Sequence, residues 1–277
     1  MNRRDALAPP SVRWPTWFTL LALFIGAACG PPGALPAQSA VARAGETIEA
    51  GDDALPPSSP TYATDPVGAA LLGGPLSYAA ERELTRALGD RGDHPVGDGR
   101  LALLAQWAAR RAARGITIEP ALVDAVARRI GYVGPTPWVA FFPCGADAEH
   151  PVADADLQRV LAAVPSNVPV TRYGLATLHR GAGQDVVAVA LNSLEVTLRP
   201  IPKRFAVNDT LRLSGKVGDR FVTARLAITL PDGKVRTWGS ASRAVTSEWA
   251  VTKAGVHRVE LLGDGASGPV VVANFPI

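Results

Sequence analysis

The sequence has little of the chemistry that common metal and cofactor sites need. It contains two cysteines and four histidines in 277 residues, and no Cys-x-x-Cys or His-x-x-x-His spacing occurs. It also lacks a Gly-x-Ser-x-Gly nucleophile turn and a phosphate-binding glycine loop. We therefore predict no cofactor and no metal site. We interpret the histidines as surface or turn residues: His94, His150, His179 and His257.

Lysine is scarce as well, and the basic residues form no long run. The chain has four lysines, and its formal net charge of +3 comes mostly from arginines scattered among acidic residues. Because nucleic-acid binding surfaces concentrate basic charge, we predict no nucleic-acid partner. With 47% hydrophobic and 19% charged residues, the chain is too apolar for disorder and too polar for repeated membrane crossing. Its length allows two small globular domains.

The one long apolar run lies near the N-terminus, from Trp14 to Ala28. Arg3, Arg4 and Arg13 supply a basic flank, and the small residues 26–28 follow the run. Since a permanent membrane helix needs roughly 20 apolar residues, this segment is short. We predict an export signal peptide over residues 1–28, with a transmembrane anchor as the alternative.

The segment Ala27-Ala28-Cys29-Gly30 resembles a bacterial lipobox, in which the cysteine is acylated and becomes the new N-terminus. The pattern usually has Leu three residues before the cysteine, where this chain has Gly26. Ordinary cleavage after Ala28, or further on near residues 37–40, is the alternative. Lipidation would also consume a thiol that is at risk of unwanted pairing in an oxidising compartment. We expect an exported protein, periplasmic or at the cell surface, held to the membrane through a lipid on Cys29.

Residues 29–70 are rich in Pro, Gly and Ala and show no sustained period, with two adjacent prolines at Pro56 and Pro57. Such a composition is typical of an extended, partly stiff spacer. We predict a tether.

Residues 71–200 predict a helical α+β domain in which helices precede a mostly antiparallel sheet. Helical spacing of apolar residues begins near Pro75, Asp98 is placed to cap a second helix, and Pro120 suits the first turn of a third that Gly131 ends. A continuous apolar run predicts a strand buried on both faces. The predicted elements are helices at 76–88, 101–112, 120–130 and 154–163, a strand at 138–142, a hairpin of 173–178 with 186–191, and a strand at 195–198.

Residues 201–277 change to short alternating segments, which favour an all-β immunoglobulin-like sandwich without the cysteine pair of antibody domains. We predict turns at 231–233 and 263–265. The expected strands are 205–213, 224–229, 235–238, 247–251, 256–262 and 270–275.

The segment from about Ala80 to Leu191 resembles the secreted CAP superfamily, which unites cysteine-rich secretory proteins, antigen 5 and plant pathogenesis-related protein 1. The resemblance is carried by residues 84–92 after the first helix, by residues 98–105, where an Asp precedes an Ala-rich helix, and by the closing strand pair. It implies a helical α/β sandwich-like domain.

The resemblance also implies a cleft lined by two His and two acidic residues. Here residues 110–120 contain no His, and Asn167 lies where a second His would be expected. We therefore interpret the segment as a degenerate copy that keeps the scaffold without the metal-binding residues, because a fold alone does not confer activity.

Two weaker candidates for chemistry remain. Cys144 and His150, with Asp147 or Glu149 nearby, could form an activated nucleophile, although a free Cys after an apolar strand is more often simply buried. The tryptophans could stack on sugars, but single aromatics on helices and strands are usually core. These are Trp107, Trp138, Trp238 and Trp249.

We expect a noncatalytic binding or structural module of the cell envelope. Its expected partners are the membrane, through the lipid, and envelope proteins or cell-wall glycans. The alternative is a cell-wall or peptide hydrolase that uses a cleft in the α+β domain, with Cys144 and His150 as its candidate residues.

Overall fold

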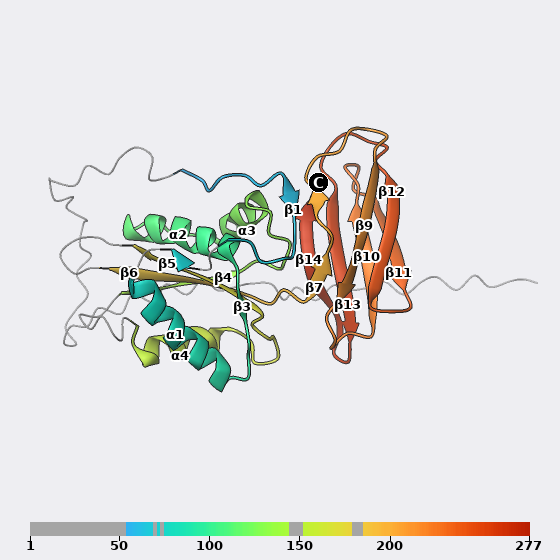
Figure 1. Cartoon of the computed structure of the whole chain (residues 1–277). Coiled ribbons are helices and arrows are strands. Elements are labelled where there is room, and N and C mark those ends of the chain that lie inside the picture. The colour runs from blue at the N-terminus through green and yellow to red at the C-terminus, as the bar shows by residue number, and fades with distance from the viewer. Residues whose placement is uncertain (1–53, 69–70, 73–74, 144–151, 179–184) are drawn as a thin grey trace, which may run out of the picture.

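The computed structural model describes residues 54–68, 71–72, 75–143, 152–178 and 185–277 (Figure 1). It combines helices with several sheets, which confirms the predicted mixture of α and β structure. The predicted signal peptide, Cys29 and most of the predicted tether lie outside the described residues.

A five-stranded sheet forms the centre of the α/β part, residues 71–192. Along the main path the strands run in the order β2-β5-β6-β4, and β3 pairs with β5. Both β2 and β3 pair with β5 in parallel, and they precede the helices Pro75–Asp90 and Gly99–Ala113, respectively, in the chain. The predicted order of helices before a mostly antiparallel sheet is therefore wrong. The hairpin of β5 and β6 is antiparallel, with Arg172 opposite Asn192, as the sequence predicts. The strands are β2 (Leu71–Leu72), β3 (Val96–Gly97), β4 (Trp138–Pro143), β5 (Arg172–Leu178) and β6 (Val186–Asn192).

Strand β4 differs from its prediction. Among the described residues it pairs only with β6 and so lies at the edge of the sheet, where Trp138, Val139, Ala140 and Phe141 are half-buried. The apolar run correctly predicts a strand but overstates its burial, because an edge strand has a neighbour on one side only.

Four helices cover the sheet, α2 and α3 on one face and α1 and α4 on the other (Figure 1). Alternation along β6 serves both layers: Val187 and Val189 pack with α1 and α4, whereas Ala188 and Ala190 pack toward α2. The helices are α1 (Pro75–Asp90), α2 (Gly99–Ala113), α3 (Pro120–Arg129) and α4 (Asp154–Ala163).

Helix α2 lies unusually close to the sheet at Gly174 of β5. A Cβ atom on Gly174 would lie 2.1 Å from the backbone nitrogen of Ala102, so only glycine fits there. The alanines of α2, such as Ala102 and Ala105, are fully buried at this contact. Small residues on both sides therefore set the spacing between the two layers.

Residues 196–277 form the β part, two packed antiparallel sheets with the strand orders β11-β10-β13-β14 and β12-β9-β7. Alternate side chains point into one core, among them Leu213, Leu226, Trp249 and Leu261. The strands are β7 (Val196–Leu198), β9 (Thr210–Val217), β10 (Thr223–Thr229), β11 (Val235–Ser240), β12 (Ala244–Ala250), β13 (Arg258–Gly265) and β14 (Gly268–Pro276).

The strand expected at 205–213 begins only at Thr210, after a turn at 207–208, so its first five residues were wrongly assigned. Two further local predictions for this region are wrong. Strand β7, assigned from the sequence to the first domain, pairs with β9 in the β part. The turn expected at 263–265 falls at 266–267, because β13 continues through Asp264, which lies opposite Thr223 of β10. Both differences arise from pairing between distant segments, which local composition does not report.

The end of the predicted tether packs on the folded parts. Strand β1 (Thr61–Tyr62) pairs with β8 (Ile201–Pro202), and Tyr62 is 3% exposed with its ring centroid 4.8 Å from that of Phe275. The amide of Asn274 also donates to the carbonyl of Val133, at 2.9 Å, which joins β14 to the α/β part.

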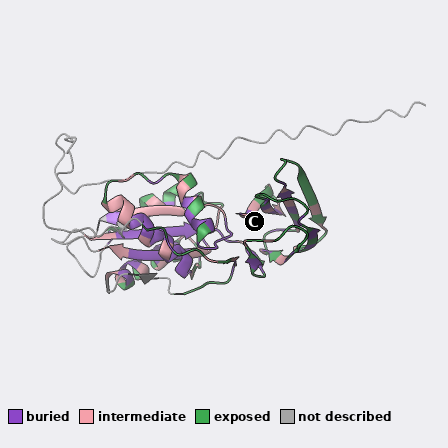
Figure 2. Ribbon diagram, turned by 90° about the horizontal axis from the view of Figure 1, so that it is seen from above, coloured by how far each residue is buried: buried purple, intermediate pink, exposed green. Residues whose placement is uncertain are grey.

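The two parts differ in how many of their residues are buried. In Figure 2 buried residues run through the sheet of the α/β part, whereas exposed residues are frequent over the β part. Among the described residues, no helix has the length and apolar character to cross a membrane.

Candidate functional site

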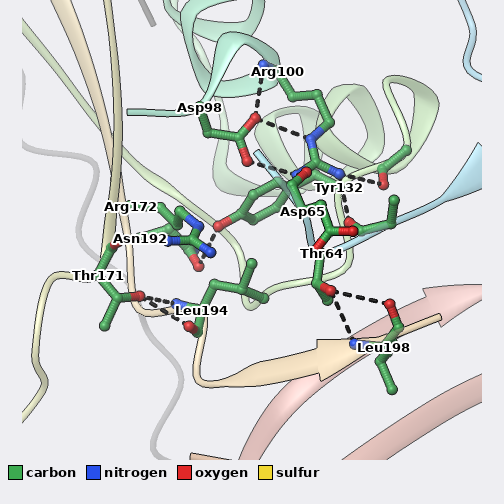
Figure 3. Close-up of polar contacts among 12 residues, drawn as sticks. Thr64, Asp65, Asp98, Arg100, Tyr132, Thr171, Arg172, Asn192, Leu194 and Leu198 are labelled. Carbon is green, nitrogen blue, oxygen red and sulfur yellow. Dashed lines mark hydrogen bonds and ion pairs between the residues drawn. The ribbon is translucent and has the colours of Figure 1, made fainter. Parts of the chain in front are cut away.

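A buried ion pair stands at the start of α2. Asp98 caps the helix by accepting from the backbone N–H of Arg100, at 3.0 Å, as predicted. Its carboxylate also binds the Arg100 guanidinium at both oxygens, at 3.0 Å from Nε and 2.6 Å from Nη2 (Figure 3). Asp98 is fully buried and Arg100 is 6% exposed. Such a bidentate pair is among the stronger interactions in a protein interior.

Arg100 uses its remaining donors to hold the segment before α1. Its Nη1 donates to the carbonyl of Ala63 at 2.5 Å and its Nη2 to the carbonyl of Asp65 at 2.8 Å. Its guanidinium carbon lies 5.4 Å from the centroid of the Tyr132 ring. One side chain thus ties the N-terminal segment, α2 and the end of α3 together.

Tyr132 extends this network to the sheet. Its hydroxyl donates to Oδ1 of Asn192 at 2.9 Å, and Nδ2 of Asn192 donates to the carbonyl of Pro135 at 2.7 Å. Burial, and then the charge of Asp98, raise the pKa of Tyr132 far above its ordinary value. The phenol is therefore a fixed hydrogen-bond donor, and the chain Asp98, Arg100, Tyr132 and Asn192 is called the buried network below.

Two threonines beside the network fasten the connection between the two parts (Figure 3). Oγ1 of Thr171 accepts from the N–H of Leu194 at 2.7 Å and donates to its carbonyl at 3.0 Å. Thr64 does the same for Leu198, at 2.9 and 3.1 Å. Each hydroxyl thus pairs with the N–H and the carbonyl of one leucine, the two groups that a neighbouring strand would otherwise bind.

Arg91 closes the C-terminal end of α4 in a similar way. Its guanidinium donates to the carbonyls of Leu161, Val164, Pro165 and Val168, at 2.8 to 3.4 Å. A cation at this position satisfies carbonyls that the helix leaves free and complements the helix dipole.

Lys203 lies where the two parts meet. Its ammonium donates to the carbonyls of Arg128 and Arg129 at the end of α3, both at 2.6 Å, and lies 4.8 Å from the centroid of the Tyr62 ring. Burial, with the charge of Arg129, lowers the pKa of Lys203 to about 8. Burial likewise raises the pKa of Tyr62 to about 12.

A second acidic group lies on the other face of the sheet. The hydroxyl of Tyr173 on β5 donates to a carboxylate oxygen of Glu81 on α1, and burial with this bond raises the pKa of the phenol. The pair joins α1 to the sheet, beside a second contact between Ser77 and Thr177 at 3.0 Å.

The residues proposed from the sequence for chemistry are not tested by the structure. Cys29, Cys144 and His150 lie outside the described residues. His94 is exposed, as expected, whereas His257 is 2% exposed and packs against Trp249, so its interpretation as a surface or turn residue needs correction.

The tryptophans divide between core and partial exposure. Trp107 and Trp249 are buried, as the core interpretation predicts, and Trp138 and Trp238 are half-buried. Within the described ranges, no three His, Cys, Asp or Glu side chains come together as ligands for a metal ion.

The buried network was missed in the sequence apart from the Asp98 cap. One signal was available, because Arg100 shares the helical spacing of Leu104 and Ala108, residues of the buried face. An arginine in that row needs a buried partner, and Asp98 lies two residues before it.

Comparisons with known proteins leave the chain without an assigned family. No protein family model matches it, and no curated protein is similar. Among the solved structures that match, an endonuclease/exonuclease/phosphatase from Beutenbergia cavernae DSM 12333 is similar at 16% identity with a TM-score of 0.19. The match covers 39% of this chain and 34% of that one, and a likeness this weak carries no argument about fold or function.

Proposed function

We propose that the protein is an exported envelope protein, anchored by a lipid on Cys29, that serves as a noncatalytic binding or structural module. The observation that carries the proposal is that charged side chains of the α/β part are engaged inside the protein. Asp98, Arg100 and Arg91 all bind other parts of the same chain. This is the arrangement expected of a rigid scaffold.

The proposed architecture is a degenerate CAP-like domain followed by an immunoglobulin-like sandwich. The two helical layers over a sheet with a closing antiparallel hairpin support the first. Two packed antiparallel sheets of four and three strands support the second. The junction between them contains β1, β8 and Lys203, so the pair is proposed to act as one rigid unit.

The hydrolase alternative rests on Cys144 and His150. It predicts that Cys144→Ala abolishes hydrolysis of peptidoglycan or a peptide by the exported protein, whereas the noncatalytic proposal predicts no such activity in either form.

The anchor is tested by fractionation of cells that express the full chain. Cys29→Ala should abolish incorporation of labelled fatty acid and lower the share of the protein that is recovered with the membrane. Cys144→Ala is the matched control, because it removes the chain's other thiol, and it should leave both properties unchanged. Membrane retention and labelling of Cys29→Ala equal to those of the natural chain would refute the anchor.

A further inference from the structure

Three loops gather at the end of the β part where the chain ends (Figure 1). The N–H of Asn208, in the first loop, donates to the carbonyl of Val251, which leads into the third, at 2.7 Å. A Cβ atom on Gly255, in the third loop, would lie 2.9 Å from Cβ of Pro231 in the second. We call residues 204–209, 230–236 and 252–258 the loop end.

Each loop presents an exposed valine. Val207, Val256 and Val235, which is the first residue of β11, are 46%, 61% and 58% exposed, whereas Val245 and Val259 in the adjacent strands are buried. Single exposed apolar side chains are ordinary, but these three lie at the same end of the β part, in the segments that the contacts above bring together.

The same segments are rich in basic residues. The loop end contains Arg204, Lys234, Arg236, Lys253 and Arg258, all exposed. Its acidic residues are Asp209 and Asp232, so its formal charge is five minus two, or +3. That equals the charge of the whole chain, and the remaining 23 basic and 23 acidic residues cancel.

The two acidic residues are already engaged. Asp209 accepts from the N–H of Ala206 at 2.7 Å, and Asp232 accepts from the ammonium of Lys253 at 2.5 Å and the N–H of Lys234 at 3.2 Å. Within the described part of the chain, Arg236 and Arg258 make no ion pair. Their charges are therefore directed to the solvent.

We propose that the loop end docks on the surface of an anionic phospholipid bilayer. The cations would contact lipid phosphates, and the valines would enter the boundary between headgroups and acyl chains. A soluble polyanion would use the charges but has no evident use for three exposed valines. The inference rests on the proposed function only in placing the protein beside a membrane, and it does not require the lipid on Cys29.

The test compares two charge-reversal variants of the full chain, both with Cys29→Ala so that no lipid contributes. Lys234→Glu/Arg258→Glu changes the loop end. Arg199→Glu/Lys216→Glu is the control, because it changes the net charge by the same amount at two exposed positions. Lys216 lies in β9 of the other sheet, and Arg199 directly follows β7 of that sheet. The measurement is the ratio of partition coefficients onto phosphatidylglycerol-containing and pure phosphatidylcholine vesicles. Any contribution of the N-terminal apolar segment is the same in both variants.

We expect the loop-end variant to lower this ratio about tenfold, because two of the attractive charges become repulsive, and the control to lower it less than about twofold. Equal losses in both variants would overturn the proposal, since net charge alone would then explain binding, and so would no loss in either. Circular dichroism and unfolding midpoints would establish that both variants are folded.

A third variant, Val235→Ser/Val256→Ser, separates a bilayer from a soluble polyanion. It should weaken binding to the anionic vesicles several-fold while leaving binding to soluble polyphosphate unchanged. If it leaves vesicle binding unchanged as well, the loop end is an electrostatic site for soluble polyanions and the bilayer proposal is wrong. Loss of fatty-acid labelling in Cys29→Ala is a separate outcome that the loop end cannot affect, so failure of the anchor and failure of the docking surface are distinguishable.

Discussion

The α/β part and the β part use the same ion-pair chemistry at very different depths. The side chains of Arg100 and Asp98 are 7% and 0% exposed, whereas those of Arg243 and Asp219 in the β part are 33% and 89% exposed. Removing one partner of a buried pair leaves an uncompensated charge in the interior, whereas an exposed pair contributes little. In these two pairs, the charges are withdrawn from solvent in the first part and remain in contact with solvent in the second.

Arg100→Met should give the largest effect. The substitution leaves the Asp98 carboxylate buried without its partner, so we expect a loss of about 3–5 kcal/mol in the free energy of unfolding, measured with urea. Arg243→Met is the control and should cost less than about 1 kcal/mol. Asp98→Asn added to Arg100→Met should recover part of the loss, because it removes the stranded charge. Equal losses at Arg100 and Arg243 would contradict the comparison.

Gly174→Ala should come next, with a loss of about 3 kcal/mol. The new methyl group would meet the backbone of α2 at Ala102, which cannot move without shifting the helix from the sheet. Gly239→Ala in β11 is the matched control, because a Cβ atom there meets nothing within 4 Å. Thermal unfolding of both variants would measure the difference, and a stable Gly174→Ala would show that the layers are not closely packed.

Tyr132→Phe should cost about 1–2 kcal/mol. It keeps the ring beside Arg100 but leaves Oδ1 of the buried Asn192 without its donor. Tyr78→Phe, at a tyrosine that is 66% exposed, should be neutral within about 0.5 kcal/mol. The same urea titrations measure both changes. An unchanged free energy of unfolding in Tyr132→Phe would show that the hydroxyl does not stabilise the buried network.

The smallest expected effect is the pH dependence of stability that Lys203 contributes. This residue lies at the boundary of the two parts. Because its pKa falls to about 8 in the folded protein and is about 10.4 in an unfolded chain, the unfolded state binds more protons between these values. The contribution of Lys203 to stability should therefore rise with pH across this window.

The measurement is the unfolding free energy of the natural chain minus that of Lys203→Met, at pH 7 and pH 10. We expect this difference to rise by up to about 1 kcal/mol, since water screens the partly exposed ammonium. A fall would mean that the Arg128 and Arg129 carbonyls and the Tyr62 ring stabilise the charged form more than burial opposes it.

Local features could be predicted from the sequence with good accuracy. Helix α4 has the predicted bounds, Asp98 caps α2, and the hairpin of β5 and β6 forms as expected. Each depends on neighbouring residues, such as a capping side chain or an alternation of apolar positions.

Features that depend on distant pairing could not be predicted. The sequence around Tyr62 reads as a spacer, yet β1 finds its partner in β8, about 140 residues away. The same applies to β7, which joins β9, and to Arg100, whose burial requires the carbonyls of Ala63 and Asp65. The proposed lipid on Cys29 and the candidates Cys144 and His150 remain predictions.

The most direct test of the account measures stability and vesicle binding on the same two variants of the full chain, both with Cys29→Ala. Arg100→Met should lower the unfolding free energy by about 3–5 kcal/mol and leave the anionic-to-neutral vesicle ratio of the folded protein unchanged. Lys234→Glu/Arg258→Glu should do the reverse, with stability changed by less than about 1 kcal/mol and the ratio reduced about tenfold. If Arg100→Met weakened vesicle binding while folded, or the loop-end variant lost as much stability as Arg100→Met, the division of roles between the two parts would be wrong.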